Sequence, residues 1–349
     1  MDQKKILLLF VVFAAILGSC QAGPVVIEAA PDVDSNLIPE SLSPEEATTL
    51  ASLEQVDEFP LYTMIFQAEY TSVEMTGAIS PMFQESTDWA CSLFAIFGDL
   101  DDMLYGRNFD WDFSPGLLLF TDPPNGYASV SMVDLYYLGF GYDAAYGLED
   151  LPLEDLTSLL DAPYLPFDGM NEAGLAIGMA AVPEGGVPPD PDKQTIDSLL
   201  VIRKILDGAA TIEEAVEIIK TYNIDWGSGP TLHYLVAEAS GRSALVEFSK
   251  GEIVVRENQH PWQAATNFLV SEAGADPATR CWRYGVITEQ VEGSEGKLSA
   301  DEAMTLLESV SQANTQWSVV YEMSTGDVNV VMGREWDNVH IFHLDRTAP

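Results

Sequence analysis

The sequence predicts a mixed α+β fold in which strands outnumber helices. Of the 349 residues, 47% are hydrophobic, which is enough for a large core and argues against a disordered chain. Short apolar runs bounded by turn-forming residues recur along the chain, as in buried strands. One stretch, residues 212–222, instead places Ile212, Val216 and Ile219 on one face of a helix. No Pro/Gly/Ser-rich linker divides residues 91–344, which we therefore assign to one domain.

The first expected elements precede and follow Cys91. Ser43, with Pro44 next and Glu46 three residues on, is typical of a helix start, and a strand is expected over residues 59–70. After Cys91, two apolar runs separated by a Gly/Asp turn predict a hairpin. Further strands are expected at 117–120, 176–181, 232–237, 243–248, 253–255, 318–322, 328–332 and 339–344, and helices at 196–206, 212–222 and 299–311.

Charge restricts the possible partners. The chain carries 15 Lys and Arg against 55 Asp and Glu, for a formal net charge of −40. Nucleic-acid binding is excluded, because contacts to phosphates need a basic surface. Anionic lipid headgroups would also be repelled. The acidic residues are spread along the chain, which predicts a solvated acidic shell suited to a salt-rich habitat.

The N-terminus indicates export. Two lysines precede the apolar run 6–17, which is short for a membrane span and typical of a signal-peptide core. The run ends in Leu-Gly-Ser-Cys, similar to a lipobox, with residues 1–19 removed and Cys20 lipidated. The alternative is an ordinary signal peptide cut near Ala22. Either way we expect an exported protein, a cell-surface lipoprotein or a secreted one, whose only membrane contact is a possible lipid anchor at Cys20.

Cys91 is the main candidate for chemistry. The hairpin that follows it would bring Arg107 and Asp110 back beside its thiol. A thiolate is the reactive form of cysteine, and a neighbouring cation lowers the thiol pKa below its free value of about 8.5. This arrangement predicts a cysteine nucleophile.

Five motifs in order resemble the cysteine N-terminal-nucleophile (Ntn) hydrolases, a superfamily that includes choloylglycine hydrolases, penicillin V acylases and acid ceramidase. The resemblance covers roughly residues 91–344 and implies an αββα sandwich of two stacked antiparallel sheets. The motifs are Cys91 with Arg107 and Asp110 in the string GRNFDW, Asp168 to Leu175 (DGMNEAGL), Thr231 to Tyr234 (TLHY) with Glu247, Thr266-Asn267, and Arg283-Tyr284.

The resemblance implies that residues 20–90 are a tether and pro-segment, removed by autocatalytic cleavage at Ala90-Cys91, and that residues 91–349 form the catalytic domain. The new α-amino group, with an ordinary pKa of about 7.7–8.0, would act as general base. Arg107 would stabilise the thiolate and Asp110 would orient the α-ammonium group. The alternative is that the segment before Cys91 is a permanent part of the fold. Its strand at 59–70 could also stay attached after a cut.

The resemblance also implies an oxyanion site, because attack on an amide carbonyl places negative charge on oxygen. The side-chain amide of Asn267 and the backbone N–H of Asn171 are the expected donors, although an asparagine in such a string often only forms a turn. Arg283 matches a second active-site arginine of the family by its Arg-Tyr context. Arg280 is its rival.

Other chemistries find less support. His233 could serve Cys91 as in papain-like proteases, but the local sequence typical of those enzymes is absent, and the family places such a histidine on a structural strand. With 4 His and 3 Cys, we expect no metal site, and we find no cofactor motif. His340 and His343 are expected on a strand in structural roles. If Cys20 is lipidated and Cys91 catalytic, only Cys281 remains, so no disulfide framework is expected.

The family cuts linear, non-peptide amides, so the expected substrate is a small N-acyl amide and no cofactor is implied. The apolar tracts 117–120 and 136–142 could supply an acyl pocket, or could simply be core. Two alternatives remain: an acyltransferase on the same scaffold, and a catalytically silent surface lipoprotein.

Overall fold

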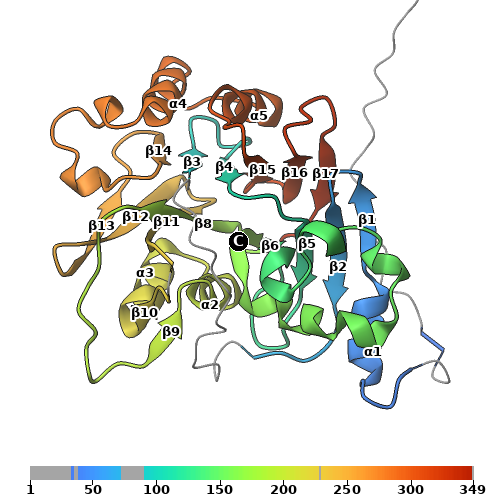
Figure 1. The fold of residues 1–349 in the computed structure, drawn as a ribbon. Coiled ribbons are helices and arrows are strands. Elements are labelled where there is room, and N and C mark those ends of the chain that lie inside the picture. Colours follow the sequence, from blue (N-terminus) through green and yellow to red (C-terminus); the bar gives the residue numbers. More distant parts are fainter. Residues whose placement is uncertain (1–32, 35–37, 72–89, 228, 348–349) are drawn as a thin grey trace, which may run out of the picture.

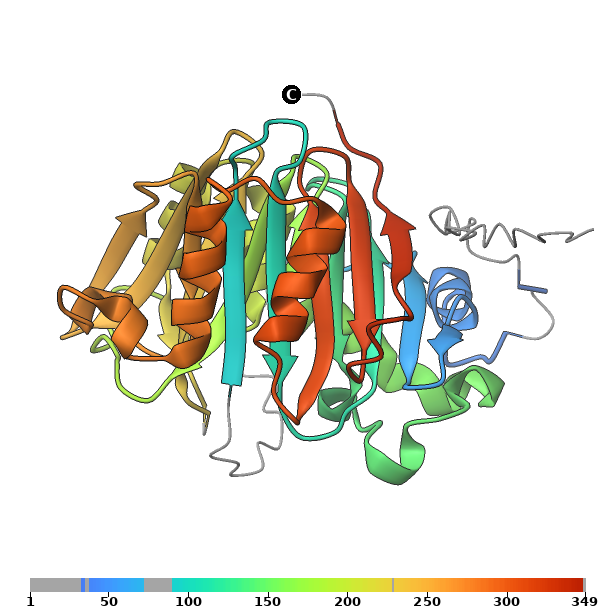
Figure 2. The same ribbon diagram turned by 90° about the horizontal axis from the view of Figure 1, so that it is seen from above.

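Two antiparallel sheets stacked face to face, with helices on both outer faces, form the body of the protein (Figures 1 and 2). The computed structural model describes residues 33–34, 38–71, 90–227 and 229–347. The predicted signal peptide, Cys20 and residues 72–89 before Ala90 lie outside these residues. Helices α2 (Leu200–Gly208) and α3 (Ile212–Thr221) cover one sheet, and α4 (Trp282–Gly293) and α5 (Ala300–Ser309) cover the other. This confirms the αββα sandwich.

The larger sheet has nine strands in the order β1-β2-β5-β6-β7-β8-β11-β12-β13. The strands are β1 (Glu54–Asp57), β2 (Leu61–Phe66), β5 (Gly116–Thr121), β6 (Ser129–Asp134), β7 (Pro166–Asn171), β8 (Leu175–Val182), β11 (Thr231–Glu238), β12 (Arg242–Ser249) and β13 (Glu252–Glu257). Its central strands β6, β7 and β8 are buried along their whole length. This explains the continuous apolar run of β8, because a strand covered on both faces loses the usual alternation.

The smaller sheet carries Cys91 and has the order β14-β3-β4-β15-β16-β17. Its strands are β14 (Trp262–Ala265), β3 (Ala90–Ile96), β4 (Leu104–Asp110), β15 (Thr315–Glu322), β16 (Asp327–Met332) and β17 (His340–His343). The predicted hairpin is β3–β4, with Ala90 opposite Asp110 and Leu93 opposite Arg107. The fully buried side chains of Leu93 and Phe94 help to fill the core beside it.

The segment before Cys91 is built into the larger sheet. Helix α1 (Pro44–Ala51) begins with the predicted capping box at Ser43 and packs against β2. β2 pairs in parallel with β5, and the side chains of Leu61 and Met64 are fully buried. Before any cut, this segment is therefore part of the core.

The structure differs from the sequence predictions at several elements. The helix expected from residue 196 begins at Leu200, because residues 195–197 form the short strand β9, paired in parallel with β10 (Asn223–Asp225). We did not predict α4, whose apolar residues form no clear stripe along one face. We also missed β6 and β7. For the string at residues 168–175 we expected only a turn. It is the end of β7 followed by a tight turn at Gly174, whose φ of +77° favours glycine.

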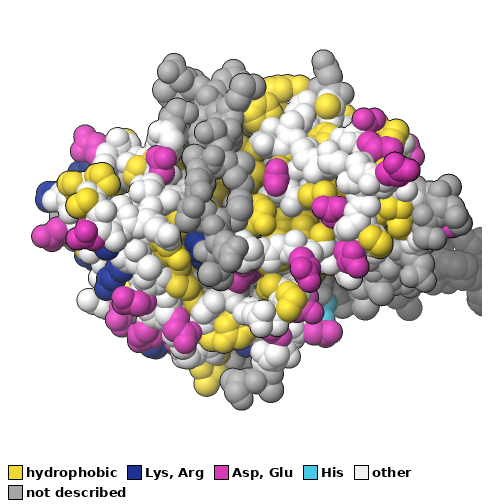
Figure 3. Space-filling model, turned by 90° about the horizontal axis from the view of Figure 1, so that it is seen from below, with side chains coloured by type: hydrophobic (Ala, Val, Ile, Leu, Met, Phe, Trp, Pro, Cys, Tyr) yellow, Lys and Arg dark blue, Asp and Glu magenta, His cyan; other side chains and the backbone are white. Residues whose placement is uncertain are grey.

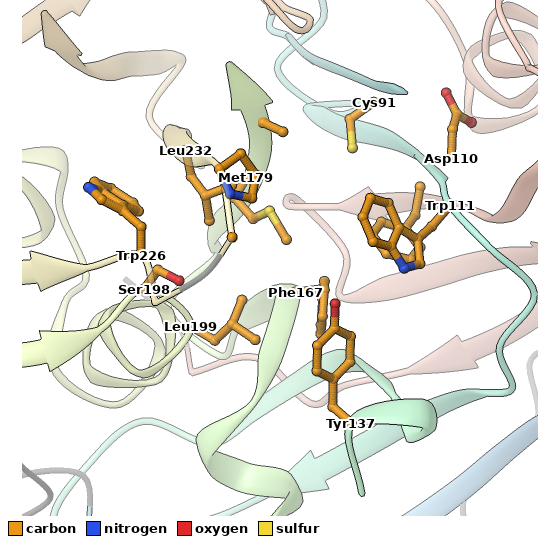
Figure 4. Close-up of a pocket in the computed structure, with 14 residues that line it drawn as sticks. Cys91, Asp110, Trp111, Tyr137, Phe167, Met179, Ser198, Leu199, Trp226 and Leu232 are labelled. Carbon is orange, nitrogen blue, oxygen red and sulfur yellow. The ribbon is translucent and has the colours of Figure 1, made fainter. Parts of the chain in front are cut away.

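The remaining part of the chain that bears on the site is a run of 3₁₀ helices between β6 and β7. These are η1 (Leu135–Leu138), η2 (Tyr142–Ala144), η3 (Leu148–Asp150) and η4 (Leu153–Tyr164). Helix η4 packs against α1 and α2, and η1 points Tyr137 toward Cys91's pocket (Figure 4). Among the described residues, no helix has the length and apolar character needed to cross a lipid bilayer.

Candidate active site

Cys91 lies near the start of β3 with 4% of its surface exposed, and its thiol opens into a pocket between the two sheets (Figure 4). The backbone N–H and the backbone carbonyl of Cys91 are both hydrogen-bonded to side chains. The N–H of Cys91 donates to Oδ1 of Asn267 at 2.7 Å, and the carbonyl of Cys91 accepts from Nη1 of Arg283. The structure therefore fixes the position of the sulfur without using the thiol itself.

Arg283, not Arg280, is the arginine at this site. Its guanidinium, in the first turn of α4, also donates to Ser92 Oγ at 3.0 Å and to Asn267 Oδ1 at 2.8 Å, whereas Arg280 is exposed. Asn267 in turn donates its side-chain amide to the carbonyl of Ala181 at 2.8 Å. Asn267 thus lies against Cys91, but with its oxygen toward Cys91 and its amide engaged on β8, so the expected donation of this amide to an oxyanion is not seen in the uncut chain.

Arg107 reaches the site from β4 and is fully buried. It forms an ion pair with Asp168 of β7 and donates to the carbonyl of Phe167 at 2.6 Å. Its Nε and Nη2 find no hydrogen-bond acceptor among the described residues. Asp168 accepts further bonds from Tyr321 Oη at 2.5 Å and Trp317 Nε1 at 3.4 Å, both on β15. Asp168, a residue our sequence reasoning did not single out, therefore anchors Arg107 across the two sheets.

The pKa of the Cys91 thiol is raised, opposite to the expectation from sequence. Burial is the dominant cause, and the charge of Arg107, followed by a smaller contribution from Arg283, only opposes it. The negative charge of Asp110 raises the pKa further. Desolvation outweighs the cations here because the thiolate would form in an almost closed space. Activation of this thiol in the uncut chain thus needs a proton acceptor and not only a neighbouring positive charge.

Asp110 ends β4 directly opposite Ala90, the residue before Cys91. Thr315 donates its hydroxyl to Oδ1 at 2.5 Å, and Oδ2 lies 4.0 Å from Arg283 Nη1. Burial raises the pKa of Asp110 to about 6, against the opposing effects of Thr315, Arg283 and Arg107. A carboxylate that titrates just below neutrality therefore faces the Ala90–Cys91 region.

Asn171 is not brought to the pocket, which corrects its expected role as an oxyanion donor. Its side-chain amide donates to the carbonyls of Leu206 at 3.0 Å and Ala209 at 2.7 Å, and its oxygen accepts from the N–H of Leu175 at 3.1 Å. It satisfies free carbonyls at the end of α2 and closes the turn between β7 and β8. The role of Asn171 is structural.

His233 pairs with Glu247 rather than with Cys91. Its Nδ1 lies 3.5 Å from Glu247 Oε1, and Glu247 also accepts the N–H groups of Val270 at 2.6 Å and Ser271 at 2.8 Å. This buried cluster holds the loop that follows Asn267. His340 and His343 lie on β17 as predicted, each 2.6 Å from an aspartate.

The pocket in front of Cys91 is apolar. Its walls are Cys91, Phe109, Asp110, Trp111, Tyr137, Phe167, Met179, Ala181, Ser198, Leu199, Trp226, Gly229, Pro230 and Leu232. Asp110 is the only charged residue among the described residues of this wall. Of the tracts suggested from sequence, Tyr137 contributes, while residues 117–119 are buried within the sheet. Most other wall residues were missed, because they come from β7, β8, β11 and two loops whose convergence depends on the fold.

Two wider observations complete the site. On the face seen in Figure 3, Asp and Glu side chains are distributed around the surface while hydrophobic side chains gather toward its middle. This agrees with a dispersed acidic shell. Within the described ranges, no three His, Cys, Asp or Glu side chains are grouped so as to hold a metal ion.

The stacked sheets and the position of Cys91 define an Ntn-hydrolase fold. The model of the linear amide C-N hydrolases, choloylglycine hydrolase family, matches residues 91–267, just over half of the chain. The protein belongs to this family.

Similar proteins agree with this assignment. A penicillin V acylase of Pectobacterium atrosepticum is 30% identical over 111 residues, which is 29% of this chain and 29% of that protein. The structure of a penicillin V acylase from Agrobacterium tumefaciens has a TM-score of 0.51 and 19% identity, over 73% of this chain and 87% of that one. A mutant conjugated bile acid hydrolase from Clostridium perfringens has a TM-score of 0.50 and 17% identity, over 74% and 93%. At these identities the two structures show the shared fold.

Proposed function

We propose that the protein hydrolyses linear, non-peptide amide bonds of small N-acyl substrates, with Cys91 as the nucleophile. The observation that carries this proposal is the thiol of Cys91, which opens into an apolar pocket while its backbone is held by Asn267 and Arg283. Membership of a family of linear amide C-N hydrolases supports the same reaction.

We further propose that Cys91 becomes N-terminal by self-cleavage. Its sulfur attacks the carbonyl carbon of Ala90, the Ala90–Cys91 C–N bond breaks, and the nitrogen takes up a proton. Water then hydrolyses the thioester, releasing Ala90 as a carboxylate and Cys91 with a free thiol and α-amine. The position of Asp110 opposite Ala90 supports this, since a carboxylate there can exchange a proton with the reacting groups.

In the mature enzyme, the α-amine of Cys91 would serve as the base that activates the thiol. Arg107, whose Nε and Nη2 find no acceptor among the described residues, would stabilise the thiolate. Asp110 would accept a hydrogen bond from the α-ammonium group. Asn267, whose Oδ1 accepts the N–H of Cys91 at 2.7 Å, would accept a hydrogen bond from the α-ammonium group after the cut.

The pocket favours a neutral, apolar acyl group. Its walls are mainly aromatic and aliphatic, and a negatively charged acyl group would lose hydration beside the carboxyl of Asp110 without gaining a partner of opposite charge. Relatives are named for penicillin V and for conjugated bile acids. We propose N-acyl amides with an apolar or aromatic acyl part as the substrate class. From the apolar run 6–17 and Cys20, we also propose an exported protein anchored by lipid.

The test is the intact mass and N-terminal sequence of the purified protein, beside Cys91→Ala. Cys281→Ala is the matched control, because Cys281 is the other free cysteine among the described residues. We expect a fragment beginning at Cys91 in the wild type and in Cys281→Ala, and none in Cys91→Ala. The cut proteins should then release amine from N-acyl amides and lose this activity on alkylation of Cys91. An uncut, inactive wild-type chain would contradict the proposal.

A further inference from the structure

Trp226 stands between two hollows of the molecule. On one side it is part of the wall of the Cys91 pocket, across from Trp111 (Figure 4). On the other side it lines an open groove on the surface. The groove is formed by Val187, Pro188, Pro189, Asp190, Lys193, Thr195, Tyr222, Asn223, Ile224, Asp225, Trp226, Phe248 and Ile253. Among the described residues of the two linings, Trp226 is the one that they share.

Packing holds the indole of Trp226 in this place. Its ring meets Phe248 of β12 edge-on, with ring centres 5.0 Å apart, and Phe248 packs in the same way against Tyr234 of β11 at 6.1 Å. Tyr234 is fully buried in the larger sheet. Aromatic pairs of this geometry are favourable beyond the area that they bury. The indole is thus anchored to the sheet and forms a firm end wall of the pocket.

The groove beyond Trp226 suits an alkyl chain. Its floor and walls include the side chains of Pro188, Tyr222, Phe248 and Ile253, and its polar residues include Lys193, whose ammonium donates to the carbonyl of Lys220 at 2.6 Å. Because Trp226 lines both hollows, an acyl chain that extended from Cys91 toward this groove would meet its side chain.

We propose that Trp226 sets the maximum length of the acyl group, and that the outer groove is a latent subsite for the distal part of a long-chain acyl group. This inference rests on the proposed function. In the wild-type protein the chain ends at the indole. When the indole is removed, the pocket opens toward the groove, and each further methylene can pack along the side chains of Tyr222, Phe248 and Ile253, which lie among the groove's polar residues.

The test measures how n-alkanamides of four to fourteen carbons protect Cys91 from iodoacetamide, in the wild type, Trp226→Ala and Trp226→Phe. Trp282→Ala is the control, because Trp282 is 57% exposed on α4 and lines neither hollow. Burial of one methylene strengthens binding about fourfold. In the wild type, we expect the protection of Cys91 to stop improving once the alkanamide reaches a certain length. In Trp226→Ala, we expect the protection to keep improving about fourfold per carbon for two or more carbons beyond that length.

The outcomes separate the two proposals. If no alkanamide protects the wild type, the apolar acyl pocket fails and the proposed function with it. If the wild type is protected and Trp226→Ala has the same or a shorter preferred length, the inference about Trp226 alone is overturned. Should Trp226→Ala fail to fold, Trp226→Phe decides: a preferred length unchanged from the wild type overturns the inference, and a longer one supports it.

Discussion

Ala90 and Asp110 lie directly opposite each other in the β3–β4 ladder, so a buried carboxylate faces the residue whose carbonyl would be attacked. The same carboxylate is bonded to Thr315 and lies near Arg283. One group is therefore placed to serve both the uncut chain and the mature nucleophile. The predictions below test this site and its supports.

The buried aspartates should make the uncut protein more stable in mild acid. Burial raises the pKa of Asp134 to about 7 and those of Asp110 and Asp197 to about 6. Unfolded aspartate has a pKa of about 3.9, so the folded chain binds more protons between these values. The free energy of unfolding should therefore rise as the pH falls from 8 toward 5, by about 2–4 kcal/mol for Asp134 alone.

Denaturation of Cys91→Ala in high salt measures this, since salt screens the self-repulsion of the net charge of −40. Asp134→Asn should flatten the profile, because the carboxyl that takes up the proton is gone. A steady loss of stability from pH 8 to pH 5 in Cys91→Ala would contradict the prediction.

Self-cleavage should slow as the pH falls through about 6. Below this pH, Asp110 becomes protonated and can no longer accept a proton or hold an ammonium group. The measurement is the fraction of cut chain against time, by mass spectrometry, from pH 4.5 to 8. If the cleavage rate did not change across pH 6, Asp110 would have no role as a proton acceptor in the reaction.

Replacing Arg283 should slow cleavage by about a hundredfold, because its loss frees the backbone of Cys91 next to the attacked carbonyl of Ala90, and a small misplacement of reacting groups can cost that much. Arg283 bonds the carbonyl of Cys91, Ser92 and Asn267, and none of these contacts can be made by alanine. Arg280→Ala is the matched control and should cut at the wild-type rate, since Arg280 is exposed. Equal effects of the two substitutions would argue against the assignment of Arg283.

Asp168→Asn should destabilise the fold by about 3–5 kcal/mol, because it leaves the fully buried Arg107 without its carboxylate. The double substitution with Arg107→Met should recover much of this loss, since no unpaired charge remains. Urea denaturation measures both. Tyr105→Phe is a control from the same core: it removes a bond to the carbonyl of Leu235 and none to Asp168. If the effects of Asp168→Asn and Arg107→Met on the free energy of unfolding were simply additive, Asp168 and Arg107 would not be energetically coupled.

The two pieces should stay together after a cut. β2 lies inside the larger sheet, Tyr70 donates to Asp207 Oδ1 at 2.9 Å, and Asp57 lies 2.6 Å from His340. We expect the fragments to co-elute in gel filtration and to separate only in denaturant. Leu61→Asp, which places a charge at a fully buried position of β2, should loosen the association. Recovery of a folded body without the N-terminal piece would contradict this.

Several features of the site could be predicted from the sequence because they depend on local pattern. The hairpin after Cys91 follows from two apolar runs and a turn, and it places Arg107 opposite Leu93 and Asp110 opposite Ala90. The capping boxes at Ser43, Thr211 and Ser299 mark real helix starts. Such features are set by neighbours a few residues apart, whose physical preferences need no knowledge of the rest of the chain.

What only the tertiary structure decided are contacts between distant segments. Arg283 rather than Arg280 reaches Cys91 because the first turn of α4 carries Arg283 inward, whereas Arg280 ends the preceding 3₁₀ turn and is exposed. Asn171 hydrogen-bonds the end of α2 and does not reach the pocket. Asp168 forms an ion pair with Arg107 from the opposite sheet. The raised pKa of Cys91 has the same origin. Burial is a property of the whole packed molecule, and here it outweighs the local charges from which the sequence predicted a more acidic thiol.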